Sequence, residues 1–250
     1  MKQLLVAAAG LAALGVSSAT AADLAVRPAK VPVVTPAMTW EGFYLGAQGG
    51  GGWGRSKETY LGAPNDPAFI GTQSYTTSGG FVGGVVGYNW QAGPAVFGLE
   101  GDYHWSDING RSAIINVGPP NVLDTYYTAL RSFGDIKGRL GYADGPALWF
   151  VSGGAAVGDI QHRYSAGLAP PSFAASQMRW GWTAGAGVEY MFAPNWSAKA
   201  EYNYIDLGKA APIQYTADPT DRSEWRDTFH TVKVGLNYHF NWSGPVVAKY

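Results

Sequence analysis

The sequence contains no cysteine, so it can hold neither a disulfide framework nor a thiolate-bound metal, and it offers no cysteine nucleophile. Charged residues are also scarce. They make up 14% of the 250 residues, whereas a globular domain carries about 25%. The formal net charge is -1 and there is no run of five or more Lys or Arg, so we expect no nucleic-acid partner.

Long hydrophobic runs are missing as well. The apolar stretch Leu4–Val16 is shorter than the roughly 20 residues that a transmembrane helix requires. It follows Lys2 and precedes small residues that end in an Ala-x-Ala pattern at 19–21, which is the order of parts in a secretory signal peptide. We therefore expect export, with cleavage after Ala21 or Ala22 and no helical anchor in the mature chain.

What the sequence does contain is glycine, aromatic residues and a period of two. From Trp40 onward apolar residues alternate with polar ones, which predicts strands rather than helices. The alternation is clearest in five segments and diluted by glycine in three, namely 43–53, 80–90 and 147–158. The eight predicted strands are Phe43–Trp53, Gly80–Trp90, Ala95–Asp107, Ser132–Tyr142, Ala147–Gly158, Arg179–Tyr190, Trp196–Ile205 and His230–Phe240.

The connections between these segments alternate in length. Residues 91–94, 143–146 and 193–195 are short and rich in turn formers, and four other connections are long and polar: 54–78, 106–129, 159–178 and 206–228. Short periplasmic turns and long extracellular loops are typical of outer-membrane barrels. The predicted fold is therefore all-β, an eight-stranded antiparallel up-and-down transmembrane β-barrel.

The faces of the predicted strands separate this fold from a soluble β-sandwich. In the five clear strands the apolar face carries no charged residue, whereas the polar face carries a nearly balanced charge set that suits a narrow lumen. We expect Glu100 and Asp102 to meet Lys137 and Arg139 near mid-barrel, and removal of these four side chains to open a water path. The predicted lumen network consists of Glu100, Asp102, His104, Arg131, Asp135, Lys137, Arg139, Arg179, Glu189, Lys199, Glu201 and Lys233.

Tryptophan residues gather at the ends of the predicted strands, which core tryptophans of a soluble protein would not do. Indole rings prefer the headgroup level of a bilayer, so this placement predicts two aromatic girdles. The turn-side girdle comprises Trp40, Trp90, Trp149, Trp196 and Trp242, and the loop-side girdle comprises Trp53, Trp105, Trp180 and Trp182.

The sequence offers no catalytic, metal or cofactor site. Glu100, Asp102 and Asp135 could be imagined as catalytic carboxylates, but the lumen of an eight-stranded barrel is filled by side chains and would exclude a substrate. Of the four histidines, we expect His104 and His239 to face the lumen as hydrogen-bonded residues. His162 and His230 fall in or near the long loops, where an exposed histidine is usually solvated and haem ligation is the minority interpretation.

Four motifs resemble those of the outer-membrane immunogenic protein family, a group of OmpA-like surface barrels of alphaproteobacteria. They are Trp40–Gly46, the glycine-rich block 79–84 with Gly87–Trp90, Gly181–Tyr190 and Val232–Phe240, so the resemblance spans residues 40–240. It implies an outer-membrane barrel without catalytic residues, and Phe240 as the aromatic end that barrel-assembly machinery reads. The chain departs from the pattern by continuing ten residues, to Tyr250.

The predicted organisation is a signal peptide at 1–21, a Pro-rich periplasmic linker at 22–39, the barrel at 40–242 and a tail at 243–250. The role that fits best is a structural one in the envelope, with narrow solute permeability at most, among outer-membrane lipid and lipopolysaccharide. Two alternatives stay open. One is a general diffusion porin, and the other is binding of haem or of a host or environmental ligand through the loops, since related members have been linked to haem binding and weak channel activity.

Overall fold

A computed structural model describes residues 38–62, 71–116, 122–166, 173–210, 213–214 and 222–240. The predicted signal peptide, most of the predicted linker, Trp242 and the predicted tail lie outside these ranges. Within them, no helix has the length and apolar character needed to cross a membrane.

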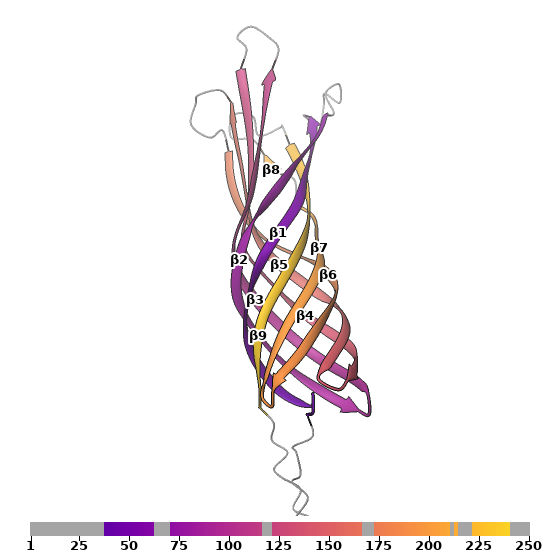
Figure 1. Cartoon of the computed structure of the whole chain (residues 1–250). Coiled ribbons are helices and arrows are strands. Elements are labelled where there is room, and N and C mark those ends of the chain that lie inside the picture. The colour runs from indigo at the N-terminus through magenta and orange to yellow at the C-terminus, as the bar shows by residue number, and fades with distance from the viewer. Residues whose placement is uncertain are drawn as a thin grey trace, which may run out of the picture. The chain divides into compact units, whose positions relative to one another are not determined.

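The described chain is a closed antiparallel β-barrel (Figure 1). Each long strand pairs with the next along the chain. The first strand, β1 (Gly42–Gly62), also pairs with the last, β9 (Arg222–Phe240), with Phe43 opposite Phe240, and this pairing closes the ring. A two-residue strand, β8, adds only to the loop end of β9. The eight-stranded all-β fold is therefore confirmed. The strands are β1 Gly42–Gly62, β2 Gly71–Ala92, β3 Ala95–Asn116, β4 Val122–Asp144, β5 Ala147–Ala166, β6 Phe173–Ala193, β7 Trp196–Lys209, β8 Ile213–Gln214 and β9 Arg222–Phe240.

The long strands extend well past the predicted loop-side ends. Seven of them have 19 to 23 residues and β7 has 14, whereas about 9–11 residues suffice to cross a bilayer. The predicted loops 54–78, 106–129, 159–178 and 206–228 were therefore wrong in their bounds, because most of their residues form paired hairpin arms. Beyond the membrane both strand faces can be polar, so the alternation that marks a lipid-facing strand fades there.

The three short turns lie at the opposite end from these arms (Figure 1). Gly93 and Gly145 have φ of +61° and +57°, and each precedes a proline in a two-residue turn. Only glycine adopts this left-handed backbone at little cost, so these residues reverse the chain tightly.

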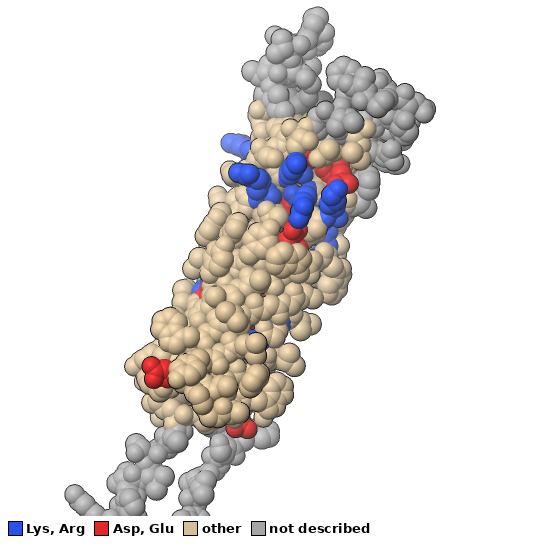
Figure 2. Space-filling model, turned by 90° about the vertical axis from the view of Figure 1, so that its right-hand side faces the viewer, with Lys and Arg blue, Asp and Glu red and all other residues tan. Residues whose placement is uncertain are grey.

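The outward face of the barrel changes character along its length. Near the turns and at mid-strand it carries exposed apolar side chains such as Leu99, Ile136 and Leu236, which are 57%, 70% and 51% exposed. Beyond Trp53, the next two outward residues of β1 are Arg55 and Lys57. Figure 2 shows on one face a broad band with few charges and, nearer the loops, a cluster of Lys and Arg. We call the strand portions up to the loop-side tryptophans the membrane-level part, and the remainder the loop-side part.

Seven of the predicted girdle tryptophans are exposed on the outward face: Trp53, Trp90, Trp105, Trp149, Trp180, Trp182 and Trp196. Trp40 is an exception, because only 1% of it is exposed. Its backbone N–H donates to Gln91 Oε1 at 2.8 Å, and its ring meets the His239 ring edge-on at 5.6 Å. Gly42, with φ of +122°, bends the chain between Trp40 and β1, so this indole closes the turn end of the lumen instead of facing lipid.

Arg131 also departs from its predicted place in the lumen network. The pairing of β4 with β5 shifts between Leu130 and Ser132, and this bulge leaves Arg131 exposed. A bulge adds one residue to one strand and so reverses the inside–outside alternation on one side of it. Leu130 therefore faces inward along with Phe133, although the two differ in parity.

Candidate functional site in the barrel lumen

A layer of buried charges crosses the membrane-level part of the lumen. It draws on β3, β4, β6, β7 and β9, and strand pairing places Glu100 opposite Lys137 and Glu201 opposite Lys233. We call this set the ionic layer, and none of its members is more than 8% exposed. The ionic layer consists of Glu100, Asp102, Asp135, Lys137, Arg139, Glu189, Lys199, Glu201 and Lys233.

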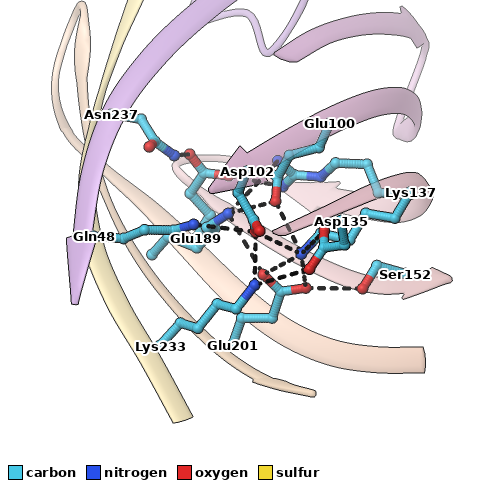
Figure 3. Close-up of polar contacts among 12 residues, drawn as sticks. Gln48, Glu100, Asp102, Asp135, Lys137, Ser152, Glu189, Glu201, Lys233 and Asn237 are labelled. Atoms are coloured by element: carbon cyan, nitrogen blue, oxygen red, sulfur yellow. Dashed lines mark hydrogen bonds and ion pairs between the residues drawn. The ribbon is translucent and has the colours of Figure 1, made fainter. Parts of the chain in front are cut away.

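Lys137 is the centre of the ionic layer (Figure 3). Its Nζ lies 3.2 Å from Glu100, 3.3 Å from Asp102, 3.3 Å from Asp135 and 3.1 Å from Glu201. Glu100 and Asp102 belong to β3 and Asp135 to β4 itself, whereas Glu201 comes from β7, across the lumen. One ammonium group thus joins strands that lie on opposite sides of the ring.

The other three cations complete the layer. Lys233 Nζ lies 2.6 Å from Asp102 and 3.1 Å from Asp135, while Lys199 Nζ lies 2.8 Å from Glu100. Arg139 binds Glu189 at 2.7 Å and Glu100 at 3.4 Å. Glu100 and Asp102 therefore meet Lys137 as predicted, and Arg139 meets Glu100. Each charge has a partner, which offsets the several kcal/mol that burial of an isolated ion costs.

Uncharged polar groups surround the ionic layer. Tyr44 donates its hydroxyl to Glu100 at 2.7 Å, and Gln48 donates to Asp102 at 3.1 Å. Towards the turns, Asn237 and Ser197 each donate to Glu189 Oε1 at 2.6 Å. These groups occupy carboxylate lone pairs that the cations leave open, and they fix the layer in one arrangement.

Both histidines that were predicted to face the lumen lie beside this layer. His104 is fully buried, with Nδ1 3.4 Å from Asp102 and Nε2 3.0 Å from Gln48. His239 is 1% exposed, and its Nε2 lies 2.9 Å from the Ser197 hydroxyl. Both residues have the hydrogen-bonded lumen positions that the alternation predicts.

Arg179 faces the lumen but belongs to a second, loop-side polar cluster. Its guanidinium is ion-paired with Asp227 and donates to the Leu207 carbonyl at 3.0 Å. Asp227 lies 3.4 Å from His162 Nε2, and the Thr128 hydroxyl lies 2.9 Å from His162 Nδ1. The prediction that His162 is an exposed loop residue was wrong, because β5 continues to Ala166 and turns this side chain inward, where it stacks on Trp225.

Large apolar side chains also face the lumen, which the sequence reasoning missed. Most of them form two clusters: a loop-side cluster between the ionic layer and the Asp227 cluster, and a turn-side cluster at the closed end. Trp225 and Ala210 form a third, smaller cluster. The sequence of β9 could have predicted one of these inward apolar residues, because Phe229 lies an even number of residues from Asp227 and Lys233 and so shares their inward face. The loop-side cluster is Phe81, Ile108, Leu130, Phe133, Ala156, Ile160, Ile205, Leu207 and Phe229, and the turn-side cluster is Trp40, Val96, Leu148, Phe150 and Met191.

One arrangement resembles a hydrolytic triad without offering its chemistry. Thr128, His162 and Asp227 form a hydroxyl–imidazole–carboxylate chain, but Thr128 is fully buried and its hydroxyl is also 2.6 Å from that of Tyr75. A nucleophile must reach its substrate, and this hydroxyl has no accessible surface. Among the described residues, no group of three or more His, Asp or Glu is arranged to hold a metal ion.

His230 is the one histidine on the outward face. Its ring stacks on Trp53 with centroids 5.6 Å apart, and its Nδ1 lies 2.6 Å from the Tyr202 hydroxyl. Phe240, the predicted assembly signal, is the last residue of β9 and its ring lies 5.6 Å from that of Phe43 on β1. It therefore sits where the ring closes.

Comparison with known proteins agrees with this architecture. Residues 9–240 match the outer membrane protein beta-barrel domain family. The 31 kDa outer-membrane immunogenic protein of Brucella melitensis is 35% identical over 242 residues, which cover 93% of this chain and 98% of that protein. The 22 kDa outer membrane protein of Rhizobium leguminosarum is 31% identical over 211 residues, which cover 83% of this chain and 81% of that protein.

Among solved structures, the attachment invasion locus protein Ail of Yersinia pestis aligns with a TM-score of 0.40 at 14% identity, over 80% of this chain and 99% of that chain. The family match covers most of the chain, and the relatives are named as outer-membrane proteins. The chain is an integral β-barrel protein of the Gram-negative outer membrane and belongs to the outer-membrane immunogenic protein family.

Proposed function

We propose that this protein is a structural barrel of the outer membrane whose lumen is sealed, so that it strengthens the envelope without conducting solutes. The observation that carries the proposal is the stacking of different barriers along one lumen. On β9 the inward residues pass from His239 and Asn237 through Lys233 to Phe229 and then Asp227, and each of these is at most 1% exposed.

The ionic layer and the apolar clusters block solutes for different reasons. In the ionic layer, every cation is held by at least two contacts to buried carboxylates, so a passing ion would have to break strong pairs. In the loop-side cluster, Phe81 and Phe133 meet edge to face at 5.2 Å, and apolar constrictions exclude water by dewetting. Loss of one barrier leaves the other in place.

This arrangement changes the expectation for the four-residue variant. Neutral substitution of Glu100, Asp102, Lys137 and Arg139 removes the centre of the ionic layer but leaves both apolar clusters, so we now expect no water path and no rise in conductance. Only additional truncation of both apolar clusters to Ala, at Phe133 and Phe229 on the loop side and at Trp40 and Phe150 on the turn side, should produce channels.

Planar-bilayer recording tests the proposal. The wild-type protein and the four-residue variant should give no steady single-channel current, and the eight-residue variant should conduct, with a general porin as the positive control. Resistance of the folded band to SDS without boiling shows that each variant is a barrel. Large, steady currents from wild type would favour the porin alternative and overturn the sealed-lumen proposal.

The envelope role has a separate test. A strain that lacks the protein should become more sensitive to detergent with a metal chelator, and both wild type and the closed four-residue variant should restore resistance, provided that the variant reaches wild-type abundance. Unchanged sensitivity in the deletion strain would contradict the envelope role.

The haem alternative draws no support from the histidines, since three are buried in the lumen and His230 lies on the outward face against Trp53.

A further inference from the structure

Three cations lie side by side on the outward face of the loop-side part. Strand pairing places Lys57 of β1 directly opposite Arg226 of β9, and Arg226 directly opposite Lys209 of β7. Lys57 is exposed, and the side chains of Arg226 and Lys209 are 54% and 66% exposed. Arg55 faces outward on β1, two residues nearer the membrane. We call these four residues the cationic row.

Without a bound anion, the cationic row is unfavourable because its like charges repel one another. Side chains directly opposite on paired strands have Cβ atoms about 4.5–5.5 Å apart, and like charges in such positions repel. Two acids relieve this only partly, because Asp206 binds Arg226 at 2.7 Å and Glu224 binds Lys209 at 2.7 Å. Among the described side chains, Arg55 and Lys57 have no ion-pair partner, so the row keeps an excess of two positive charges.

The bulge in β7 is what brings the third cation to this face. Pairing of β7 with β9 shifts between Asp206 and Lys209, and Gly208 has the left-handed φ of +64° that this shift requires. Leu207 faces inward. In a regular strand Lys209 would face inward too, because it lies two residues after Leu207, and the bulge turns it outward instead. The local backbone thus adds a third exposed charge beside two others.

The height of the row indicates what neutralises it. Trp53 is 49% exposed and stacks on His230. Because the short turns of outer-membrane barrels are periplasmic, this loop-side tryptophan marks the headgroup level of the outer leaflet. At about 3.3 Å per residue, Arg55 lies about 7 Å and Lys57 about 13 Å beyond Trp53 along β1, and their heights above Trp53 are smaller because barrel strands are tilted by about 35–45°. The row therefore faces sideways, toward groups that project from lipid headgroups.

We propose that the cationic row binds the phosphate groups of an outer-leaflet glycolipid, that is, of lipopolysaccharide. Phosphate oxygens accept strong hydrogen bonds from guanidinium and ammonium groups, and a multiply charged anion relieves the repulsion among Lys57, Arg226 and Lys209. The cluster of Lys and Arg near the loops in Figure 2 lies above the band of few charges, where such a lipid would stand against the barrel.

The test measures binding of the detergent-extracted protein to phosphatidylcholine vesicles that contain bisphosphorylated lipid A. The row variant is Lys57→Gln/Lys209→Gln/Arg226→Gln. Its matched control, Arg111→Gln/Arg131→Gln/Arg163→Gln, removes the same charge from exposed positions on β3, β4 and β5. A charge-keeping variant, Lys57→Arg/Lys209→Arg/Arg226→Lys, separates loss of charge from a change of shape. All must keep the SDS-resistant folded band.

We expect the row variant to lose at least tenfold in vesicle affinity, and the control and charge-keeping variants to stay within about threefold of wild type. Wild-type binding should fall to the level of the row variant when the lipid A is dephosphorylated. Equal loss in the row variant and its control would show a diffuse charge effect and overturn the site, as would unchanged binding by the row variant.

Two further arms exclude other anions. Inorganic phosphate at the same phosphorus concentration should compete at least tenfold less well than the vesicles, because it lacks the bilayer that presents it at the height of the row. Equal competition would mean that the row is a free-phosphate site. Binding of an acidic polypeptide as tight as that of lipid A vesicles would instead indicate a protein partner, and either result overturns the lipid assignment.

Discussion

The membrane-level and loop-side parts of the same strands have opposite polarity. At membrane level, the outward residues include Leu99, Ile136 and Leu236, and the lumen holds the ionic layer. On the loop side, the outward residues of β1 are Arg55 and Lys57, whereas Phe229, Ile160 and Trp225 point inward. A single set of strands thus behaves as a membrane barrel over one portion and as a water-soluble barrel over the next.

This difference shows that the solvent outside the barrel decides whether the outward face must be apolar, whereas the inward face holds both charged and apolar groups. Lipid requires an apolar exterior, which leaves charges for a lumen where they must pair. Water permits a charged exterior, which leaves the interior free to bury Phe229 and its neighbours by the ordinary hydrophobic effect. An ionic core and an apolar core therefore follow each other along the lumen, and a second apolar cluster closes its turn end.

The largest expected effect comes from the ionic layer. Lys137→Met should lower the free energy of unfolding by about 3–5 kcal/mol, because it leaves buried carboxylates without their shared cation. Urea unfolding in lipid vesicles measures this free energy. The control variant is Lys57→Met, at an exposed site, whose free energy of unfolding should stay within about 0.5 kcal/mol of wild type. Equal effects at the two lysines would mean that the lumen is hydrated.

The loop-side core should respond as a packed apolar interior. Ile160→Ala should cost about 2–5 kcal/mol, because Ile160 is fully buried and its loss leaves a cavity. The matched substitution Ile136→Ala removes a side chain that is 70% exposed on the outward face, where lipid fills the space, so its cost should be less than half as large. The same unfolding assay compares them, and a larger cost at Ile136 would argue against a dry loop-side core.

Adding a charge to the outward face tests where the membrane ends. Leu236→Arg should destabilise the barrel by about 2–4 kcal/mol, because it places an exposed mid-strand charge in lipid. Ala113→Arg, on the exposed loop-side face of β3, should change stability by no more than about 0.5 kcal/mol. Refolding into vesicles measures both, and wild-type folding of Leu236→Arg would show the face assignment to be wrong.

The smallest effect on stability should come from loop insertion. A protease site between Asp66 and Pro67, outside the described residues, should leave unfolding unchanged and be cut on intact cells, because it lies between the loop ends of β1 and β2. A site between Gly93 and Pro94 lies in a turn at the opposite end and should be protected. Cleavage at the second site alone would reverse the topology.

Much of the barrel could be predicted from alternation, because within an uninterrupted strand the inward or outward direction of a residue follows its parity. The inward positions of Lys137, Glu201 and Lys233 follow from this rule, as does the lipid exposure of Leu236. The lengths of the strands could not be predicted in the same way, since the loop-side arms lack a lipid-facing apolar stripe.

The amino-acid sequence by itself determined the class of fold, the order of the strands and the face of most of their residues, all of which depend on local period and turn chemistry. Only the tertiary structure decided that Lys137 of β4 reaches Glu201 of β7, because that contact depends on ring closure and stagger. It also decided that the bulge at Leu130–Ser132 puts Arg131 outside, that Gly42 turns Trp40 inward, and that His162 is buried. A period of two carries no information about where one extra residue interrupts it, nor about which sides of the ring meet across the lumen.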